Sequence, residues 1–546
     1  MNPTVTTSAA PDPDPNIIAD LSLDLRPYLK KPEHPATMGP NPAGKDPEAG
    51  NPTVPIGIIP TPTGGISNTV SAGIIFGLLA KGRKVFRRMG SLCMVEDGGI
   101  KNVSADGFCS LIEKYGRVAS REIKENKPVW RSTTLPKCSA GIIIASKEIS
   151  ILPPLRQISN CAIISRDCQV LGAGYHDHAG GTYISAASTP ATMTVDEATS
   201  ALEELLIDFD FTTPADKSRG IASLLSPALK MGEWLSPSAK FPLDFAEANE
   251  SQSGKSLRLQ IVCALYRETF KAVTAPKGGV GSLDEILGTV LIAGRPFISI
   301  DNFRGKVDST IMEAALTSNE VQARGFRMAG TVDCRTFLWQ FSTNGAEITR
   351  DLANRSIITR IRKRPANTSW RKYEEGEVME HLQANQPRYL GAVFTILKDW
   401  TRLGCPKTDE CRHDFREWCQ ALDWIVQNIF GMAPLLDGHR EEQARTSNPA
   451  LTWVRVVALA VIEAGQQGKD LTTSDLVTTA DEAGIEFPGQ PNRDEPAHRA
   501  GRILGKLFKE AGSNVLVVDG LSISRQERQQ WAGGGEMTKF YMIARN

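Results

Sequence analysis

A phosphate-loop pattern in the middle of this 546-residue chain strongly limits the folds that the chain can adopt. The segment reads Asn249-Glu-Ser-Gln-Ser-Gly-Lys-Ser256, and a phosphate loop requires Gly-x4-Gly-Lys-Ser/Thr between a strand and a helix. In such a loop backbone N–H groups and the helix N-terminus bind phosphates, Lys255 reaches the outer ones and Ser256 binds Mg²⁺. Asn249 replaces the first Gly, and Asn is the next best residue for a left-handed backbone.

The flanks of the motif agree with this interpretation only in part. A helix is expected over 257–270, whereas the preceding strand, over 241–246, is weak. By itself the motif is explained equally well as a chance Ser-Gly-Lys-Ser in a loop. The residues expected to bind the nucleotide are Asn249, Glu250, Ser251, Gln252, Ser253, Gly254, Lys255, Ser256 and Leu257.

A second element favours the phosphate-loop interpretation. Pro296-Phe-Ile-Ser-Ile-Asp301 is an apolar strand that ends in an acid, roughly 45 residues after Lys255, which is the layout of a Walker B strand. Asp301 is therefore expected to hold Mg²⁺ together with Ser256. Asn302 follows directly, and because an amide cannot take a proton from water it can only orient one. Glu313 is a more distant candidate base, although a helix-surface carboxylate is the better interpretation of it.

A third apolar strand, over 335–344, also ends in polar residues, and Asn344 is expected to contact the attacking water or the γ-phosphate. A cationic strand is expected over 358–364. Arg355, with Arg350 as second choice, is expected to reach the γ-phosphate bound by a neighbouring subunit, where a cation stabilises the charge of the transition state.

In this order, the motifs resemble the AAA+ ATPase core of phage, plasmid and genomic-island primase-helicases, in the superfamily-3, poxvirus-type neighbourhood. The resemblance lies in 251–256, 297–302 and 344–355, and it extends over about 80–440, with 385–404 and 415–431 similar to the family's helical lid. It implies ATP and Mg²⁺ as cofactors, a hexameric ring of identical subunits and translocation on DNA. The family's primase domain has no counterpart here.

The segment after about 449 predicts a winged-helix module. Helices are expected over 451–464, from Thr473 and over 497–511, followed by a pair of strands over 514–518 and 539–543. The alternative is a packing module with a cationic, solvated face. Arg324 and Arg327, between the Walker B strand and the third strand, are expected either on a pore-facing hairpin or on a plain surface loop. The candidate DNA-binding residues are Arg324, Arg327, Arg499, Arg502, Lys506, Lys509 and Arg525.

Composition limits where a nucleic-acid surface could lie and which roles the cysteines could have. The 62 Lys and Arg balance the 62 Asp and Glu, so any nucleic-acid surface must be a local patch. The ten cysteines are expected to be reduced thiols of a cytoplasmic protein, without a membrane span. Zinc ligation by Cys405, Cys411, His413 and Cys419 is disfavoured by their spacing, and 176–178 is interpreted as a polar turn rather than a metal site.

The predicted fold class is a multidomain α/β chain: a P-loop AAA+ ATPase with a helical lid, preceded by an α+β module and followed by a winged helix. The expected domains are a Pro-rich disordered arm (1–65), the α+β module (66–190), the ATPase core (191–375), the lid (376–448) and the winged helix (449–546).

The predicted function is an ATP-dependent DNA helicase or translocase in replication initiation of a phage, plasmid or genomic island. A primase or replication initiator is its expected partner. The alternatives are an ATP-switched defence or signalling ATPase without unwinding activity, and an origin-binding protein that does not hydrolyse ATP.

Overall fold

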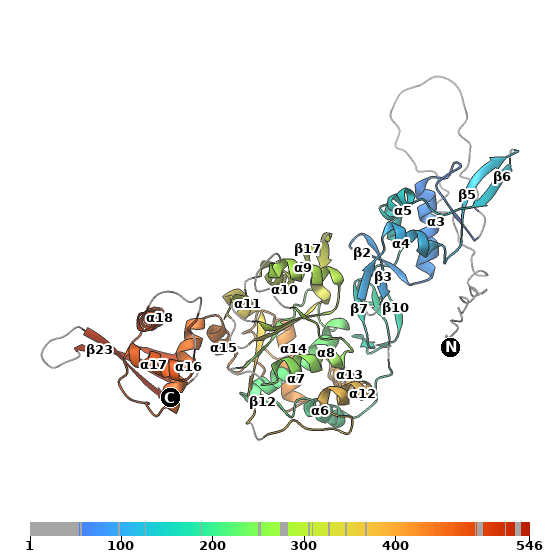
Figure 1. The fold of residues 1–546 in the computed structure, drawn as a ribbon. Helices are drawn as coiled ribbons and strands as arrows, with labels where there is room; N and C mark the ends of the chain where they lie inside the picture. The colour runs from blue at the N-terminus through green and yellow to red at the C-terminus, as the bar shows by residue number, and fades with distance from the viewer. Residues whose placement is uncertain are drawn as a thin grey trace, which may run out of the picture. The chain divides into compact units, whose positions relative to one another are not determined.

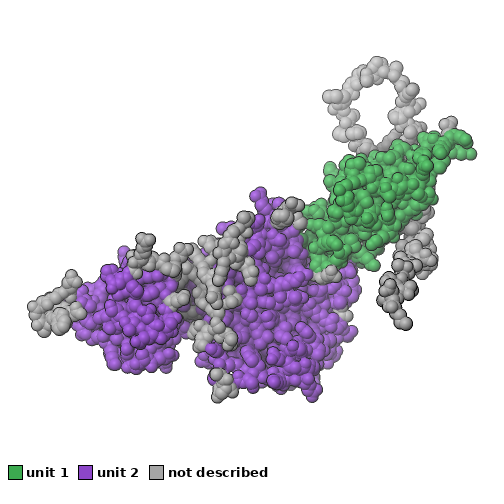
Figure 2. All heavy atoms as spheres, viewed as in Figure 1, with its two compact units in different colours: residues 1–156 green, residues 157–546 purple. Residues whose placement is uncertain are grey.

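The chain divides into two compact units, Met1–Arg156 and Gln157–Asn546, each described here by itself (Figure 2). The computed structural model describes residues 54, 57–96, 99–125, 127–186, 188–248, 253–273, 282–303, 306–307, 309–325, 328–343, 347–365, 368–485, 487–488, 495–518, 520–529 and 537–545. Most of the predicted Pro-rich arm lies outside these ranges. Among the described helices, none has the length and apolar character needed to cross a membrane.

The first unit is an α+β fold with its own apolar core (Figure 1). Ser67 and Ser104 each accept a backbone N–H at the start of a helix, which satisfies one of the amides left unpaired there. The strands at 85–88 and 91–96 and the helix at 105–112 lie within this unit. Its elements are β1 (Ile58–Pro60), α3 (Asn68–Lys81), β2 (Val85–Arg88), β3 (Ser91–Glu96), β4 (Gly99–Asn102), α4 (Ala105–Ile112), β5 (Arg117–Lys124), β6 (Lys127–Ser132) and α5 (Lys137–Ile144).

The second unit begins with short strands that lead into its main sheet. In the segment interpreted as a polar turn, the ring nitrogen Nε2 of His176 lies 2.7 Å from the carbonyl of Gly172, and that of His178 lies 3.1 Å from the carbonyl of Met231. Both rings therefore contact backbone oxygens. The strands are β7 (Gln157–Ser159), β8 (Ile163–Ile164), β9 (Val170–Leu171), β10 (Gly174–His176) and β11 (Thr182–Ile184).

A six-stranded sheet forms the centre of this unit, in the order β12-β21-β13-β19-β15-β14. All neighbours are parallel except β12, which runs antiparallel to β21. Every residue of β19 is buried, as expected for a parallel strand covered on both faces. The strands are β12 (Asp210–Phe211), β13 (Leu243–Glu247), β14 (Ala272–Val273), β15 (Phe297–Phe303), β19 (Leu338–Thr343) and β21 (Ser356–Arg362).

Helices that share one apolar cluster pack around this sheet. Thr194 caps the helix that begins at Val195 with a reciprocal bond to Glu197. Sequence patterning did not predict the buried helix α7, which holds Pro227. The hydroxyl of Tyr266 donates to the carbonyl of Leu224 (2.7 Å) and accepts the amide of Ala228 (3.2 Å), satisfying polar groups beside the proline. The helices are α6 (Val195–Glu204), α7 (Pro214–Met231), α8 (Lys255–Leu265), α12 (Val378–Ala384), α13 (Gln386–Arg402) and α14 (Arg416–Asn428).

A β-hairpin packs closely on helix α9 (Leu283–Ala293). The hairpin is formed by β17 (Glu320–Gly325) and β18 (Met328–Asp333). A Cβ on Gly288 of the helix would lie 2.2 Å from the carbonyl oxygen of Arg324, so only glycine permits this approach. Further short elements of this unit are β16 (Lys306–Val307), α10 (Thr310–Thr317), β20 (Glu347–Ile348), α11 (Arg350–Asn354) and α15 (His439–Thr446).

The C-terminal segment has an apolar core of its own, built from three helices and a three-stranded sheet. The helices predicted there are present, but the predicted pairing of 514–518 with 539–543 is wrong. A strand at 521–529 lies between them and pairs with both, and its alternate residues Leu521 and Ile523 are buried in the module's core. The elements are α16 (Pro449–Glu463), α17 (Thr473–Glu482), α18 (Pro496–Ala511), β22 (Val515–Val518), β23 (Leu521–Gln529) and β24 (Met537–Arg545).

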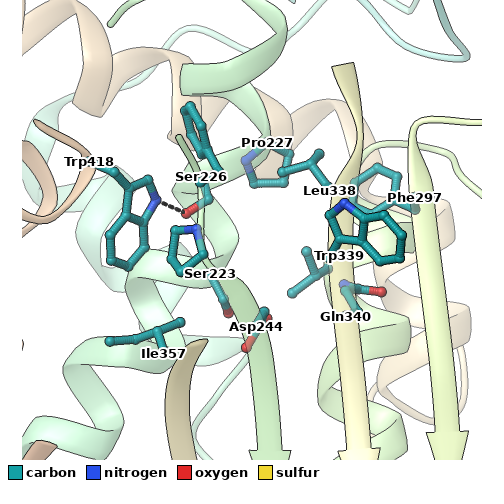
Figure 3. A pocket seen from close by; sticks show the side chains of 13 residues that line it. Ser223, Ser226, Pro227, Asp244, Phe297, Leu338, Trp339, Gln340, Ile357 and Trp418 are labelled. Atoms are coloured by element: carbon teal, nitrogen blue, oxygen red, sulfur yellow. Dashed lines mark hydrogen bonds between the residues drawn. The ribbon is translucent and has the colours of Figure 1, made fainter. Parts of the chain in front are cut away.

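A small cavity of about 30 Å³ lies at the amino-terminal ends of the parallel strands, lined also by residues of α7 and α14 (Figure 3). Ser226, which accepts the indole N–H of Trp418 at 3.0 Å, and Asp244 belong to its lining. Asp244 in turn pairs with the buried Arg258 of α8. Ligands of parallel α/β sheets bind outside the carboxyl ends of the strands, so this cavity is on the wrong side for a nucleotide.

Candidate nucleotide site

The phosphate loop joins the end of β13 to the start of α8. Gly254 is the N-cap of that helix, with φ +92°, a left-handed conformation that favours glycine. Lys255 and Ser256 form the first turn, so their backbone amides belong to the helix N-terminus, where anions bind. Four of the predicted nucleotide-binding residues, at 249–252, lie outside the described residues.

Lys255 is buried between two acidic side chains. Only 6% of the residue is exposed, and Nζ lies 3.3 Å from Oγ of Ser253. Burial lowers the pKa of Lys255, while the nearby Asp301 and Glu247 oppose that shift. Glu247, at the end of β13, escaped the sequence analysis, although an acid at the end of the strand before the loop was a usable signal. A phosphate group bound here would strengthen the charged form of the lysine.

Asp301 and Ser256, predicted as a pair, come together in the structure. Oδ1 of Asp301 accepts the hydroxyl of Ser256 at 2.6 Å and the hydroxyl of Ser342 at 2.5 Å. Ser342 is fully buried on β19, the strand between the loop strand and β15. A hydroxyl and a carboxylate are the oxygen ligands that Mg²⁺ takes from proteins, with water and phosphate oxygens as the rest. The donor set therefore fits a magnesium nucleotide.

Ser342 was missed by sequence reasoning. It stands two residues before Asn344 on a strand that was recognised. The neighbour of Asp301 could be found only from the strand order, because a parallel register decides which strand ends lie side by side.

Two amides, Asn302 and Asn344, are predicted beside the site. Asn302 belongs to β15 directly after Asp301, but its side chain lies outside the described residues, as does the whole of Asn344. Glu313 lies on α10, where its carboxylate accepts the hydroxyl of Thr349 at 2.5 Å.

The two candidate trans-acting arginines differ sharply in their surroundings. Arg355 forms an ion pair with Asp351 at 2.8 Å and donates to the carbonyl of Glu313 at 3.1 Å, so its guanidinium is committed within the chain. Arg350 is exposed at the first residue of α11, and no hydrogen bond or ion pair holds it within the described part of the chain. Of the two candidates, Arg350 is therefore the one whose guanidinium is exposed.

The candidate DNA-binding residues fall into two groups. Arg324 on β17 and Arg502, Lys506 and Lys509 on α18 are exposed. Arg499 instead lies over the ring of Phe487 (5.1 Å), and Arg525 lies over Phe508 (4.9 Å) while donating to Asn514 at 2.9 Å. These last two arginines stabilise the module itself. Arg327 lies outside the described residues.

Among the Cys and His residues at 405–419, His413 is buried and contacts protein groups. Nε2 of His413 lies 3.2 Å from the carbonyl of Ser356, and its ring stacks on His439 at 5.6 Å. Burial lowers the pKa of both histidines. Within the described ranges, no three His, Cys, Asp or Glu side chains gather as a metal site would require.

Comparison with known proteins gives limited likeness. No family model and no curated protein matches the chain. Among solved structures, the apo A form of the NrS-1 C-terminal region is similar over 86% of this chain and 98% of that chain, with 8% identity and a TM-score of 0.32. SCCmec type IV Cch, described as an active helicase, is similar over 84% of this chain and 97% of that chain, with 10% identity and a TM-score of 0.27. Because both scores are below 0.5, the function must be argued from the site.

Proposed function

We propose that this protein is an ATP-dependent DNA helicase or translocase that works as a ring, with six subunits as the expected number. The observation that carries the proposal is the meeting of Lys255, Ser256 and Asp301 where three neighbouring parallel strands end. A bound phosphate-and-metal ligand accounts for a buried lysine, a helix N-terminus and a hydroxyl–carboxylate pair in one place.

Each side chain has a distinct role in ATP hydrolysis. Lys255 binds the β- and γ-phosphates, and Ser256 and Asp301 hold Mg²⁺, while Ser342 fixes the orientation of the Asp301 carboxylate. When bound, Mg²⁺ neutralises charge that develops on the transferred phosphoryl group. Asn344, with Asn302 beside Asp301, is assigned to orienting the attacking water. The AAA+ assignment of the core and the lid assignment of the helices after 376 belong to this proposal.

Two surface features support movement on DNA by an oligomer. Arg350 is exposed and uncommitted within the described residues, as an arginine must be to reach a neighbour's γ-phosphate. Arg324 lies on a two-stranded hairpin, and Arg502, Lys506 and Lys509 form an exposed cationic face on the third helix of the winged-helix module. Cations of this kind contact the phosphate backbone. Action with a primase or initiator in replication of a mobile element rests on the sequence resemblance.

ATP hydrolysis by the full chain, measured with and without forked DNA, tests the proposal. We expect DNA to raise turnover about tenfold and the forked duplex to be unwound, because hydrolysis coupled to movement requires the track. Lys255→Ala should abolish turnover, whereas Lys217→Ala, at a surface lysine paired with Glu203, should leave it unchanged.

The outcomes separate the alternatives. Turnover that DNA does not change would favour an ATP-switched ATPase over a translocase. DNA binding without any turnover in the parent protein would favour a non-hydrolysing origin-binding protein.

A further inference from the structure

Two aromatic side chains lie directly against the phosphate loop. A Cβ on Gly254 would lie 2.8 Å from Cη2 of Trp370 and 3.0 Å from Cε1 of Phe209, so both rings touch the loop. The two rings contact each other edge to face, with their centroids 5.4 Å apart. Phe209 is buried, Trp370 is half-buried, and Leu257 of the first turn of α8 packs against the same apolar cluster.

The strand order places these rings on the opposite flank of the loop from Asp301. β21 and β12 lie on one side of β13, whereas β19 and β15, which carries Asp301, lie on the other. Phe209 directly precedes β12, and Trp370 follows β21. Because β12 is antiparallel to β21, its start and the end of β21 lie at the same edge of the sheet as the loop. A nucleotide whose outer phosphates reach Asp301 therefore extends its nucleoside toward the two rings.

The segment that carries Trp370 is anchored, so the ring is held ready. The guanidinium of Arg364 lies over the indole at 5.2 Å and forms a 3.3 Å ion pair with Asp208. The backbone N–H of Arg371 donates to the other oxygen of Asp208 at 2.8 Å, and its side chain pairs with Glu204 at 3.6 Å. A group held in its binding position loses less conformational freedom when the ligand arrives.

We propose that Trp370, backed by Phe209, stacks on the base of the bound nucleotide. The inference rests on the proposed ATP site and adds to it the group that recognises the nucleoside. Every base has a π-face, so the stack distinguishes a nucleotide from a bare polyphosphate more than it distinguishes one base from another.

Calorimetric binding of Mg-ATP and of Mg-tripolyphosphate to the full chain tests this role. Trp370→Ala should raise the Kd for ATP about tenfold, as loss of one base–aromatic stack does, and leave the Kd for tripolyphosphate within about twofold. Trp370→Phe should retain most ATP affinity, because a ring remains. Trp370→Leu, which fills the space without a ring, should behave as the alanine variant does, and it serves where the alanine variant does not fold.

Trp130→Ala, at a half-buried tryptophan of the first unit, is the matched control and should change neither Kd. Unchanged ATP affinity in Trp370→Ala and Trp370→Leu would overturn the inference. Equal weakening of ATP and tripolyphosphate would also overturn it, because Trp370 would then only support the shape of the loop. A parent protein that binds neither ligand would instead overturn the proposed ATP site, and the inference with it.

Discussion

At the scale of single residues, the site depends on side chains that hold other side chains. One carboxylate oxygen of Asp301 accepts two hydroxyls, from Ser256 and from Ser342, which come from different elements. Buried polar groups of this kind must be satisfied in the folded chain, and each one fixes the orientation of its neighbour.

Removing the buried hydroxyl of Ser342 should weaken the binding of Mg²⁺ more than the binding of the nucleotide. In Ser342→Ala, Asp301 loses one of its two hydroxyl partners, and loss of such a supporting bond costs about 10–100-fold in metal affinity. We therefore expect the Mg²⁺ concentration for half-maximal ATP hydrolysis to rise by about that factor. Ser342→Thr, which keeps the hydroxyl, should restore much of the affinity. An unchanged Mg²⁺ requirement would show that Ser342 has no part in positioning Asp301.

A second residue-scale prediction concerns Glu268, which follows the end of α8. Burial raises its pKa from 4.5 to about 7, although Asn160 donates to the carboxylate at 3.0 Å. Between these pH values the folded chain keeps a proton that the unfolded chain releases. Stability therefore falls as pH rises from about 4.5 to 7, by up to about 3 kcal/mol.

Thermal denaturation in this pH range tests whether stability falls as the pH rises. Raising the pH from 5.5 to 7.5 should lower the Tm of the parent protein by several degrees relative to Glu268→Gln, which cannot ionise. The buried His413 and His439 change stability with pH in the opposite direction. That contribution is the same in both proteins, so the difference between their Tm values excludes it. Equal pH slopes in the two proteins would contradict the shifted pKa.

At the scale of elements, helix α18 has one face that packs into the module and one face that carries exposed cations. One side packs Leu504, Leu507 and Phe508 into the core of the C-terminal module, and the other exposes three cations. The sequence predicts a helix over 497–511, but only the tertiary contacts show that Arg499 and Arg525 lie over aromatic rings of the module.

Replacing the three exposed cations of α18 should weaken DNA binding without loss of fold. In the triple variant Arg502→Ala, Lys506→Ala and Lys509→Ala, the slope of log K against log salt concentration should fall by about one for each phosphate that the helix no longer neutralises. Fluorescence anisotropy at several salt concentrations measures that slope. Alanine at Lys101 and Lys137, exposed lysines of the first unit, serves as the control. A slope equal to that of the parent would exclude this face from DNA binding.

At the scale of the whole molecule, the proposal requires subunits that complete one another's sites. Arg355 is tied to Asp351 and to α10, so its loss should lower stability, whereas Arg350 is exposed and should be needed only in an assembly. The two arginines stand five residues apart in the sequence, and only their surroundings distinguish them.

Mixing Arg350→Ala with Lys255→Ala tests this dependence. Each variant alone should be inactive, but in a mixed ring a Lys255→Ala subunit offers its Arg350 to the intact nucleotide site of an Arg350→Ala neighbour, so ATPase activity should reappear. Mixing Arg350→Ala with an Arg350→Ala, Lys255→Ala double variant should restore none. A mixture of the two single variants that stays inactive would contradict action between subunits.

Local patterns determined much of this protein from sequence alone. The loop residues Gly254 to Ser256 and the strand that carries Asp301 follow from backbone conformation and burial, which nearby residues decide. Helix α7 escaped prediction because an internal proline argues against a helix, and only the distant Tyr266 satisfies the groups beside it.

Tertiary structure alone decided which distant side chains meet. Ser342 reaches Asp301 because β19 lies beside β15, and Trp370 reaches Gly254 because β21 lies beside β13. The strand at 521–529 likewise separates two strands that sequence reasoning had paired. Strand order and register result from the packing of the whole sheet, so no local pattern records them.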